Sequence, residues 1–486
     1  MNIRAALVLV CLGTWSTLSQ PTWAIEFTPC HLSGSGGSGN LAALCGEWVQ
    51  PLDPEKPNGE TITLSVTKLP STALEPAADA FTLINGGPGG SSIDMLVDMA
   101  GIASSFTRER DVIVIDQRGT GRSAPMRCDA LTDTTNEVDF EDIVPLTEMC
   151  LQNLPWQPEF FSTTVAVQDL ENLRQALGYQ QWSIYGVSYG TRVAMQYLRQ
   201  FPDSVRSIVI DGVVPPDEVL GANIAMHSET ALQQVFERCA QDASCNTAFP
   251  NLPADFAKLK ADLKRAPVST LINHPITGEP TDVELTYDHL AVWLRLALYG
   301  PETSSLIPLI IHEAAAGKNY GSIAANALRL IDNLTNALNY GMHNAVMCTE
   351  DAPFYNDQQI DMEALEATYI GSAMYKTLDA MCSVWPQGPI HPQMKEPVTS
   401  DLPVLVLSGE FDPITPPAWG EAVMPGLSNA VHLVAPGQGH GTIARGCMPK
   451  LILEFVEDPK PQDIDASCLT HLAPSPFFIN SLGPAP

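Results

Sequence analysis

Short apolar runs that end in turn residues alternate with helical patterns along this chain, and that alternation limits the folds open to it. Continuous Val, Ile and Leu indicate strands that are buried on both faces, as in a parallel sheet. Between two of the runs, residues 165–178 carry apolar side chains at helical spacing and end at Gly178. The sequence therefore predicts an α/β fold with a doubly wound, mostly parallel sheet. The runs are AFTLIN (80–85), DVIVID (111–116), QWSIYG (181–186), SIVIDG (207–212), LPVLVLSG (402–409) and AVHLVAP (430–436).

The alternation stops after residue 212, and a mostly helical pattern follows until strand-and-turn character returns at Leu402. We interpret this stretch as a helical cap inserted into one α/β domain. Its clearest helical segments are DHLAVWLRLALYG (288–300), SSLIPLIIHEAAAG (304–317) and SIAANALRLIDNLTNALNYG (322–341). The expected organisation is a signal peptide at 1–24, the first part of the core at 25–212, the cap at 213–397 and the C-terminal part of the core at 398–486.

The first 24 residues have the features of a cleaved export signal. Arg4 precedes an apolar run from Ala5 to Gly13, and a polar stretch then ends in Thr22-Trp23-Ala24, a small-x-small cleavage pattern. The run is too short to span a bilayer, and no later segment is long and apolar enough to do so. We therefore expect a secreted or periplasmic protein, with no stable membrane anchor once the signal is removed.

The cysteine count agrees with export. Cleavage removes Cys11 and leaves an even number, which suggests five disulfides in an oxidising compartment. Sequential pairing closes loops of modest size, although other pairings stay open. No cysteine or histidine cluster has metal-ligand spacing, so we expect no metal and no cofactor. The candidate pairs are Cys30 with Cys45, Cys128 with Cys150, Cys239 with Cys245, Cys348 with Cys382, and Cys447 with Cys468.

The charge balance excludes one class of partner. The chain has 25 Lys and Arg against 55 Asp and Glu, a formal net charge of −30. Nucleic acids and anionic membranes would repel such a surface, so we expect neither as a partner. The sequence leaves the oligomeric state open.

The motif GVSYG (186–190) places one serine between two glycines, after a predicted strand and before the helical pattern TRVAMQYLRQFP. This strand–turn–helix context is the nucleophile elbow, a strained turn that lifts a serine hydroxyl above the sheet. The alternative is a purely structural Gly-Ser turn. The context predicts that Ser188 is a nucleophile.

A serine nucleophile needs a histidine as base and a carboxylate to orient that histidine. When the serine follows a strand in a nucleophile elbow, the acid comes next along the chain and the histidine after it. Asp412, in the Pro-bounded turn after the run at 402–409, is the first candidate acid, and Glu410 is the lesser one. His440 lies in the Gly-rich loop after the last strand, whereas His432 falls inside that strand. The sequence thus predicts that Ser188 attacks, His440 transfers the proton and Asp412 orients the imidazole.

The same chemistry requires N–H donors for an oxyanion. One is expected from the backbone of Tyr189, the residue after the nucleophile. The other is expected from Gly86 and Gly87 in the loop LINGGPGGSS that follows an early strand. A phosphate-binding loop is the alternative, but this stretch has neither the Lys-Ser/Thr nor the G-x-G-x-x-G of such loops.

Four segments together resemble the tripeptidyl-aminopeptidase and prolyl-iminopeptidase group of α/β-hydrolase serine peptidases. They are INGGPGG, DVIVIDQRGTGRS, YGVSYGTRVAMQYL and GEFDPITPP followed by GQGHG. The resemblance covers residues 80–212 and 402–445, and VMCTEDAPF…CSVWP (347–386) is similar to the return from cap to core in the tripeptidyl-aminopeptidase branch. One departure is Asn85, where the group's oxyanion loop usually has a histidine.

The resemblance implies an aminopeptidase that releases residues or tripeptides from peptides with a free N-terminus through an acyl-enzyme. Such a site needs a carboxylate for the substrate's ammonium, and Glu350 and Asp351 are the expected candidates, although they can also be read as a solvated helix cap. The triad alone fits a carboxylesterase or lipase equally well. A non-catalytic binding protein on the same scaffold is a further alternative, but all three triad residues are present.

Overall fold

A nine-stranded sheet forms the centre of the computed structural model, which describes residues 25–34, 39–128, 140–355 and 360–485. The proposed signal peptide and Cys11 lie outside the described residues. The strand order is β1 (Thr28–Leu32), β2 (Leu41–Pro51), β3 (Thr61–Leu69), β5 (Asp111–Ile115), β4 (Ala80–Ile84), β6 (Trp182–Val187), β7 (Val205–Asp211), β10 (Val404–Gly409) and β11 (Ala430–Ala435).

The six strands from β5 to β11 in this order are parallel, and they are the six runs predicted from the sequence. The strands β1, β2 and β3 extend the sheet through antiparallel pairs and were not predicted from the sequence. Their residues alternate between exposed and buried positions, because one face of this part of the sheet is open to solvent.

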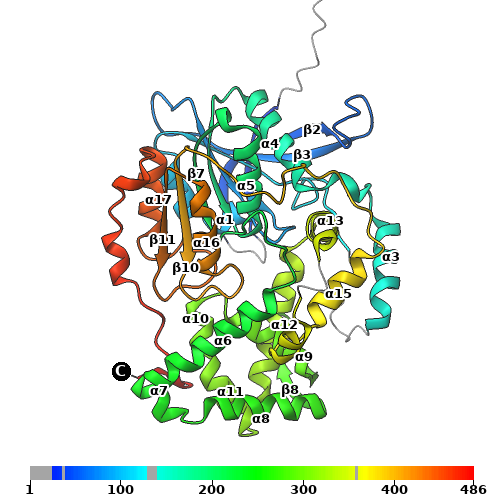
Figure 1. Ribbon diagram of the computed structural model, residues 1–486, viewed down its shortest axis with the longest axis vertical. Helices are drawn as coiled ribbons and strands as arrows, with labels where there is room; N and C mark the ends of the chain where they lie inside the picture. Colours follow the sequence, from blue (N-terminus) through cyan, green and yellow to red (C-terminus); the bar gives the residue numbers. More distant parts are fainter. Residues whose placement is uncertain (1–24, 35–38, 129–139, 356–359, 486) are drawn as a thin grey trace, which may run out of the picture.

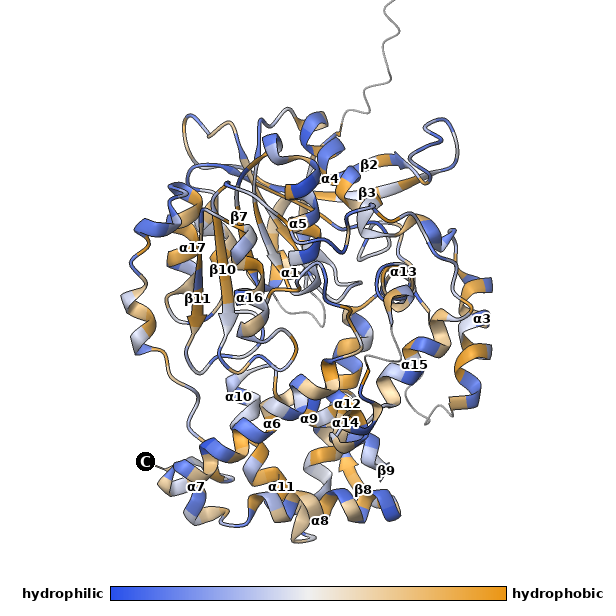
Figure 2. Cartoon of the chain, viewed as in Figure 1, coloured by the Kyte–Doolittle hydropathy of each residue, from blue (hydrophilic) through white to orange (hydrophobic). Residues whose placement is uncertain are grey.

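Both faces of the parallel strands are covered, as their continuous apolar sequences require. Along β10, Val404 and Val406 pack into one apolar cluster, while Leu405 and Leu407 pack into another on the opposite face. The first cluster includes α4 (Thr163–Leu177) and α5 (Tyr189–Gln200), and the second includes α1 (Ser92–Asp98), α2 (Ala100–Phe106) and α17 (Met448–Glu457). The hydropathy colouring shows the apolar strands between helices with mixed surfaces (Figure 2).

The predicted helical stretch follows β7 and forms a second body below the sheet in Figure 1. Apolar residues of its helices and of the hairpin make a separate cluster. The sequence analysis did not predict the hairpin β8 (Val268–Asn273) and β9 (Pro280–Leu285). The helices of this body are α6 (Ile224–Gln241), α7 (Ala243–Ala248), α8 (Leu252–Arg265), α9 (Tyr287–Ala297), α10 (Pro301–Ser304), α11 (Ile307–Ala315) and α12 (Tyr320–Ala337).

The later helices of the inserted stretch return to the core. Met342, Ala345 and Val346 of α13 (Tyr340–Glu350) pack into the same apolar cluster as α4 and α5. The short helix α14 (Met362–Ala367) and then α15 (Ala373–Cys382) follow, and the disulfide between Cys348 and Cys382 joins α13 to α15. The packing boundary between cap and core therefore lies near α13, within the stretch 213–397.

The ten described cysteines form five disulfides in sequential order: Cys30–Cys45, Cys128–Cys150, Cys239–Cys245, Cys348–Cys382 and Cys447–Cys468. The C-terminal segment crosses from core to cap, where Phe477 packs into the cap cluster and the N–H of Phe478 donates to the Ser305 carbonyl at 3.2 Å. Among the described residues, no helix has the length and hydrophobicity needed to cross a membrane.

Candidate active site

Ser188 occupies a tight turn between β6 and α5. Its φ of 57° and ψ of −128° are unusual for a residue with a side chain and store backbone strain. The flanking glycines are required by space, because a Cβ on Gly186 would lie 2.5 Å from the Gly190 oxygen, and one on Gly190 would lie 2.3 Å from the Ile84 oxygen. The crowded turn thus holds the half-buried Ser188 at the end of the strand.

Asp412 and His440 meet at the adjacent strand ends. Asp412 lies in the turn after β10 and is 4% exposed, and its Oδ2 is 2.8 Å from Nδ1 of His440. The other oxygen, Oδ1, accepts from the backbone N–H groups of Ile414 and Thr415, both at 2.9 Å. The carboxylate is therefore held from two sides and points at the imidazole.

Thr415 is part of this arrangement, although the sequence analysis did not single it out. Its hydroxyl donates to Oδ2 of Asp412 at 2.8 Å and lies 3.1 Å from Nδ1 of His440. The signal in the sequence was the Asp-x-x-Thr spacing, which lets an aspartate side chain cap its own turn. Thr415 restricts the rotation of the carboxylate that His440 contacts.

Asp211, at the end of β7, was also missed, and it connects the serine turn to the histidine loop. Its backbone oxygen accepts from the N–H of Ser188 at 2.9 Å. Its carboxylate accepts from the N–H groups of Thr442 and Ile443, at 2.7 and 3.0 Å, and from the Tyr185 hydroxyl at 2.8 Å. A buried aspartate at the end of an apolar strand was the available signal.

The charge on Asp412 changes the acidity of His440. Burial alone would lower the pKa of His440, but the charge of Asp412 and its hydrogen bond outweigh burial, so the pKa lies above the usual histidine value. This arrangement favours the imidazolium that forms when a histidine accepts a proton from a nucleophile.

The loop after β4 packs directly on the serine turn. A Cβ on Gly86 would lie 2.7 Å from Cβ of Ser188, so only glycine fits there. The N–H of Gly86 donates to its neighbour Asn85 at 2.7 Å, whereas Gly87 makes no hydrogen bond within the described part of the chain. Tyr189 is the first residue of α5, where a backbone N–H has no partner inside the helix. Gly87 and Tyr189 are thus better placed than Gly86 to offer N–H donors.

The cap holds this loop in place. The N–H and side-chain amide of Asn339 both donate to the Gly89 oxygen, at 3.0 and 3.2 Å. Nδ1 of His343 lies 3.1 Å from the Pro88 oxygen, which can only accept, so Nδ1 is the donor in this contact. The conformation of the loop therefore depends on the junction between α12 and α13.

Glu350 and Asp351 are both fully buried at the end of α13, so they do not form a solvated cap. The N–H and hydroxyl of Thr163 donate to Glu350 at 2.6 and 2.8 Å. Asp351 pairs with Arg192 at 2.8 Å and with Lys395 at 2.8 Å. Their oxygens are occupied by protein partners and are not presented to a ligand in this conformation.

The pKa values of these two carboxyl groups are shifted in opposite directions, although burial alone would raise both. Burial raises the pKa of Glu350 to about 6, despite the opposing charge of Arg192 and the hydrogen bonds of Thr163. Burial also acts on Asp351, but there the cations Arg192 and Lys395 outweigh it and lower the pKa. Asp351 is thus a fully compensated anion, and Glu350 is the more easily protonated of the pair.

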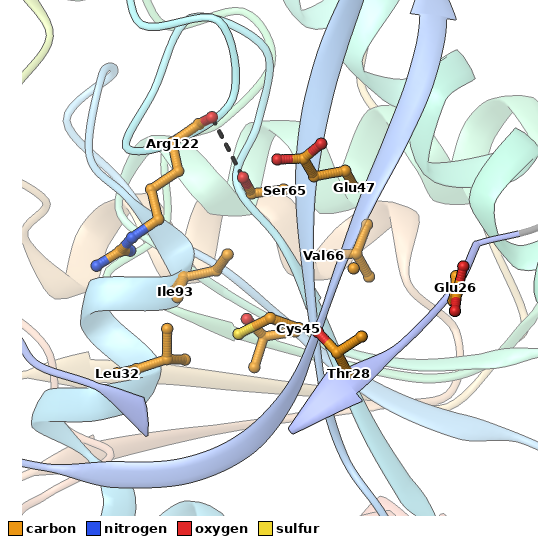
Figure 3. Close-up of a pocket in the computed structure, with 11 residues that line it drawn as sticks. Glu26, Thr28, Leu32, Cys45, Glu47, Ser65, Val66, Ile93 and Arg122 are labelled. Carbon is orange, nitrogen blue, oxygen red and sulfur yellow. Dashed lines mark hydrogen bonds between the residues drawn. The ribbon is translucent and has the colours of Figure 1, made fainter. Parts of the chain in front are cut away.

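A pocket of about 540 Å³ lies away from this site, between β2, β3 and α1 (Figure 3). Glu47, Arg122, Cys45 and Val66 are among the residues that line it. None of Ser188, Asp412 and His440 lines it, so it is not the space above the triad.

The parallel sheet, the serine turn after β6 and the late Asp–His pair define an α/β-hydrolase. The family model described as "TAP-like protein" matches residues 367–468. Serine protease Hip1 of Mycobacterium tuberculosis is 26% identical over 501 residues, covering 93% of each chain. Tripeptidyl aminopeptidase of Streptomyces lividans is 29% identical over 193 residues, or 35% of each chain. Carboxylesterase B of Mycobacterium tuberculosis is 28% identical over 426 residues, or 77% of this chain and 76% of that one.

These similarities confirm the expected relation to the tripeptidyl-aminopeptidase group, and they show that this chain is a serine hydrolase with a region similar to the TAP-like family model. The relatives carry both peptidase and esterase names, so the substrate is not decided by similarity.

Proposed function

We propose that this protein is an exported serine aminopeptidase in which Ser188 is the nucleophile, His440 the general base and Asp412 the residue that orients it. The observation that carries the proposal is the 2.8 Å contact between Oδ2 of Asp412 and Nδ1 of His440. The loop that contains His440 is also hydrogen-bonded to Asp211, which in turn accepts from the N–H of Ser188 in the strained turn. Attack by Ser188 on a carbonyl gives an acyl-enzyme, with the proton passing through His440 to the leaving amine. Water then attacks the acyl-enzyme by the same route.

The oxyanion of each tetrahedral intermediate is assigned to the N–H groups of Gly87 and Tyr189. Gly86 contributes close approach, since its missing side chain leaves room for Ser188. Asn85 replaces the histidine usual in this group and holds the Gly86 N–H with its own side chain. The proposed donors are backbone N–H groups, so an asparagine in place of a histidine at residue 85 does not remove them.

Cleavage at a free N-terminus is supported by the Streptomyces relative named tripeptidyl aminopeptidase. Glu350 remains our candidate for binding the substrate's ammonium, in preference to Asp351, whose charge is already compensated by two cations. Contact with Glu350 requires the carboxylate to leave Thr163 when substrate binds. Carboxylesterase activity is the second candidate, favoured by the relative with that name.

Export is supported by the signal pattern at residues 1–24 and by the five disulfides, which fit an oxidising compartment. In the proposed organisation, the cap of residues 213–397 lies over the ends of the core strands. It admits only the ends of peptides to the active site. Peptides with a free N-terminus are the proposed substrates.

The deciding experiment compares three substrates with purified mature protein. They are a tripeptidyl arylamide with a free amine, the same arylamide acetylated at its N-terminus, and a short-chain p-nitrophenyl ester. We expect kcat/KM to fall roughly 10- to 100-fold on acetylation, the value of one charge-assisted contact. Equal turnover of the two arylamides contradicts the aminopeptidase proposal. A high rate on the ester alone supports the esterase.

A further inference from the structure

Arg295 is a cation near the site that has no anionic partner within the described residues. It lies half-buried on α9 of the cap, its Nε is buried with no hydrogen-bond acceptor, and none of the ion pairs in this part of the protein includes it. A buried guanidinium N–H without an acceptor costs free energy, which a bound anion would recover.

The position of Arg295 relates it to the catalytic histidine. It precedes Tyr299 by four residues, and the Tyr299 oxygen accepts from the N–H of His440 at 2.8 Å. The Tyr299 ring packs edge-on against the His440 ring, with centroids 5.2 Å apart. The end of α9 that carries Arg295 is thus fixed against the loop that carries His440.

Arg295 also acts electrostatically on the residues around the oxyanion loop. Burial raises the pKa of Tyr299 and of Tyr340, and the positive charge of Arg295 opposes both increases. Burial lowers the pKa of His343, and the same charge lowers it further. Since His343 contacts the Pro88 oxygen, the field of Arg295 reaches both the histidine loop and the oxyanion loop.

A second buried polar atom without a hydrogen-bond partner among the described residues lies beside the oxyanion loop. Oδ1 of Asn339 is buried without a donor, while the rest of its amide holds Gly89 of the oxyanion loop. Asn339 directly precedes Tyr340, which senses the charge of Arg295. Asn339 and Tyr340 thus connect the residues on which the charge of Arg295 acts to the oxyanion loop.

We propose that Arg295 binds a carboxylate of the substrate. A guanidinium pairs with a carboxylate through two parallel hydrogen bonds, which gives both affinity and orientation. The substrate class is then a short peptide with an anionic group near the scissile bond, either an acidic side chain or a free C-terminus. The inference rests on the proposed hydrolase site and adds a charge preference to it.

The test uses two pairs of peptides with a free N-terminus. In the first pair, one peptide ends in a free carboxylate and the other in an amide. In the second pair both peptides have an amidated C-terminus, and one carries Glu where the other carries Gln. We expect the wild type to prefer the carboxylate member of one pair roughly 10- to 100-fold in kcat/KM. The pair that shows the preference identifies the source of the carboxylate.

Variants assign the preference to Arg295. Arg295→Gln should abolish the preference by lowering kcat/KM for the carboxylate member more than for the neutral member, and Arg295→Lys should restore part of the preference. Arg329→Gln, at an exposed arginine of α12 in the same cap, is the matched control and should keep the full preference. A wild type that treats both pairs alike overturns the inference, as does an Arg295→Gln variant that lowers both members equally.

The test of the carboxylate contact can fail or succeed independently of the test of the aminopeptidase proposal. Acetylation of the N-terminus tests the ammonium contact and leaves the carboxylate unchanged. If acetylated and free peptides react equally, the charge comparison is repeated with p-nitrophenyl butyrate and the p-nitrophenyl monoester of glutaric acid. Loss of the anionic preference in Arg295→Gln then supports the inference even though the aminopeptidase has been excluded, and absence of any preference in the wild type overturns it.

Discussion

The backbone oxygen of Asp211 accepts a hydrogen bond from the N–H of Ser188 at 2.9 Å, while the Asp211 carboxylate holds the loop that contains His440. One residue thus connects the serine turn to the histidine loop, which are some 250 residues apart in the sequence. The side chain of Asp211 hydrogen-bonds to neither Ser188 nor the imidazole of His440, so we interpret Asp211 as a positioning residue.

Replacing the Asp211 side chain should misplace His440. In Asp211→Ala, the N–H groups of Thr442 and Ile443 lose their acceptor, and each unsatisfied buried donor costs about 1–3 kcal/mol of stability. We expect kcat to fall about 100-fold or more, because catalysis is sensitive to displacements of about 1 Å. Circular dichroism and steady-state kinetics measure the two effects. Tyr185→Phe removes only one hydrogen bond to the same carboxylate and is the milder control. Unchanged kcat in Asp211→Ala would contradict the positioning role.

Loss of Ser188 or His440 should abolish hydrolysis without unfolding the protein. In triads of this kind, removal of a member costs several powers of ten in kcat, since the members act as one unit. Asp412→Ala should cost somewhat less than either. Glu410→Ala should cost little, because Glu410 contacts the Gly437 N–H and not the imidazole. Activity is measured on purified protein with the arylamide. A larger loss in Glu410→Ala than in Asp412→Ala would reassign the acid.

The activity should fall as the pH is lowered through the pKa of His440. The base must be neutral to accept a proton, and Asp412 raises the pKa of His440 above its ordinary value of about 6.5. The acidic limb of kcat/KM against pH is therefore expected above that value, and Asp412→Asn should move it to lower pH as well as reduce the rate. A limb that does not move in Asp412→Asn would show that another group controls it.

Removing the Arg192 charge should destabilise the fold strongly. Arg192 is fully buried and pairs with Asp351 at 2.8 Å, so Arg192→Met leaves a buried carboxylate with Lys395 as its remaining cation. Breaking a buried ion pair from one side costs about 3–5 kcal/mol. Chemical denaturation with the disulfides intact measures the loss. The double variant Arg192→Met with Asp351→Asn should recover part of the lost stability. If it recovers none, the charge left on Asp351 is not the cause of the loss.

The exported protein should contain no free thiol. All ten described cysteines are in disulfides, and the eleventh, Cys11, lies in the proposed signal peptide. Alkylation under denaturing, non-reducing conditions followed by mass spectrometry should give a chain that begins near Ile25 and has no adduct. One adduct together with a retained N-terminus would show that the signal is not removed. Several adducts would contradict the disulfide assignment.

Much of the core could be predicted from the sequence because its signals are local. A strand that is buried on both faces must be apolar at consecutive positions, and the six parallel strands stand out for that reason. The antiparallel strands β1 to β3 and the hairpin of β8 and β9 were missed, since a strand with one solvated face mixes polar and apolar residues and resembles a loop. The serine turn was recognisable because its glycines lie at a fixed spacing on either side of Ser188, between an apolar run and a helical pattern.

By itself, the sequence determined the type of fold and the position of Ser188 in a strained turn, and it named the candidate acid and histidine that follow. Only the tertiary structure decided which partners each side chain meets, because those contacts join residues far apart in the chain. It buried Glu350 and Asp351 against Thr163, Arg192 and Lys395, where the sequence had suggested accessible carboxylates. It also joined the serine turn to the histidine loop through Asp211, and it left Arg295 without an ion pair among the residues that the structure describes. The burial and pairing of a charged group depend on which distant elements pack beside it, and no local pattern of residues encodes that.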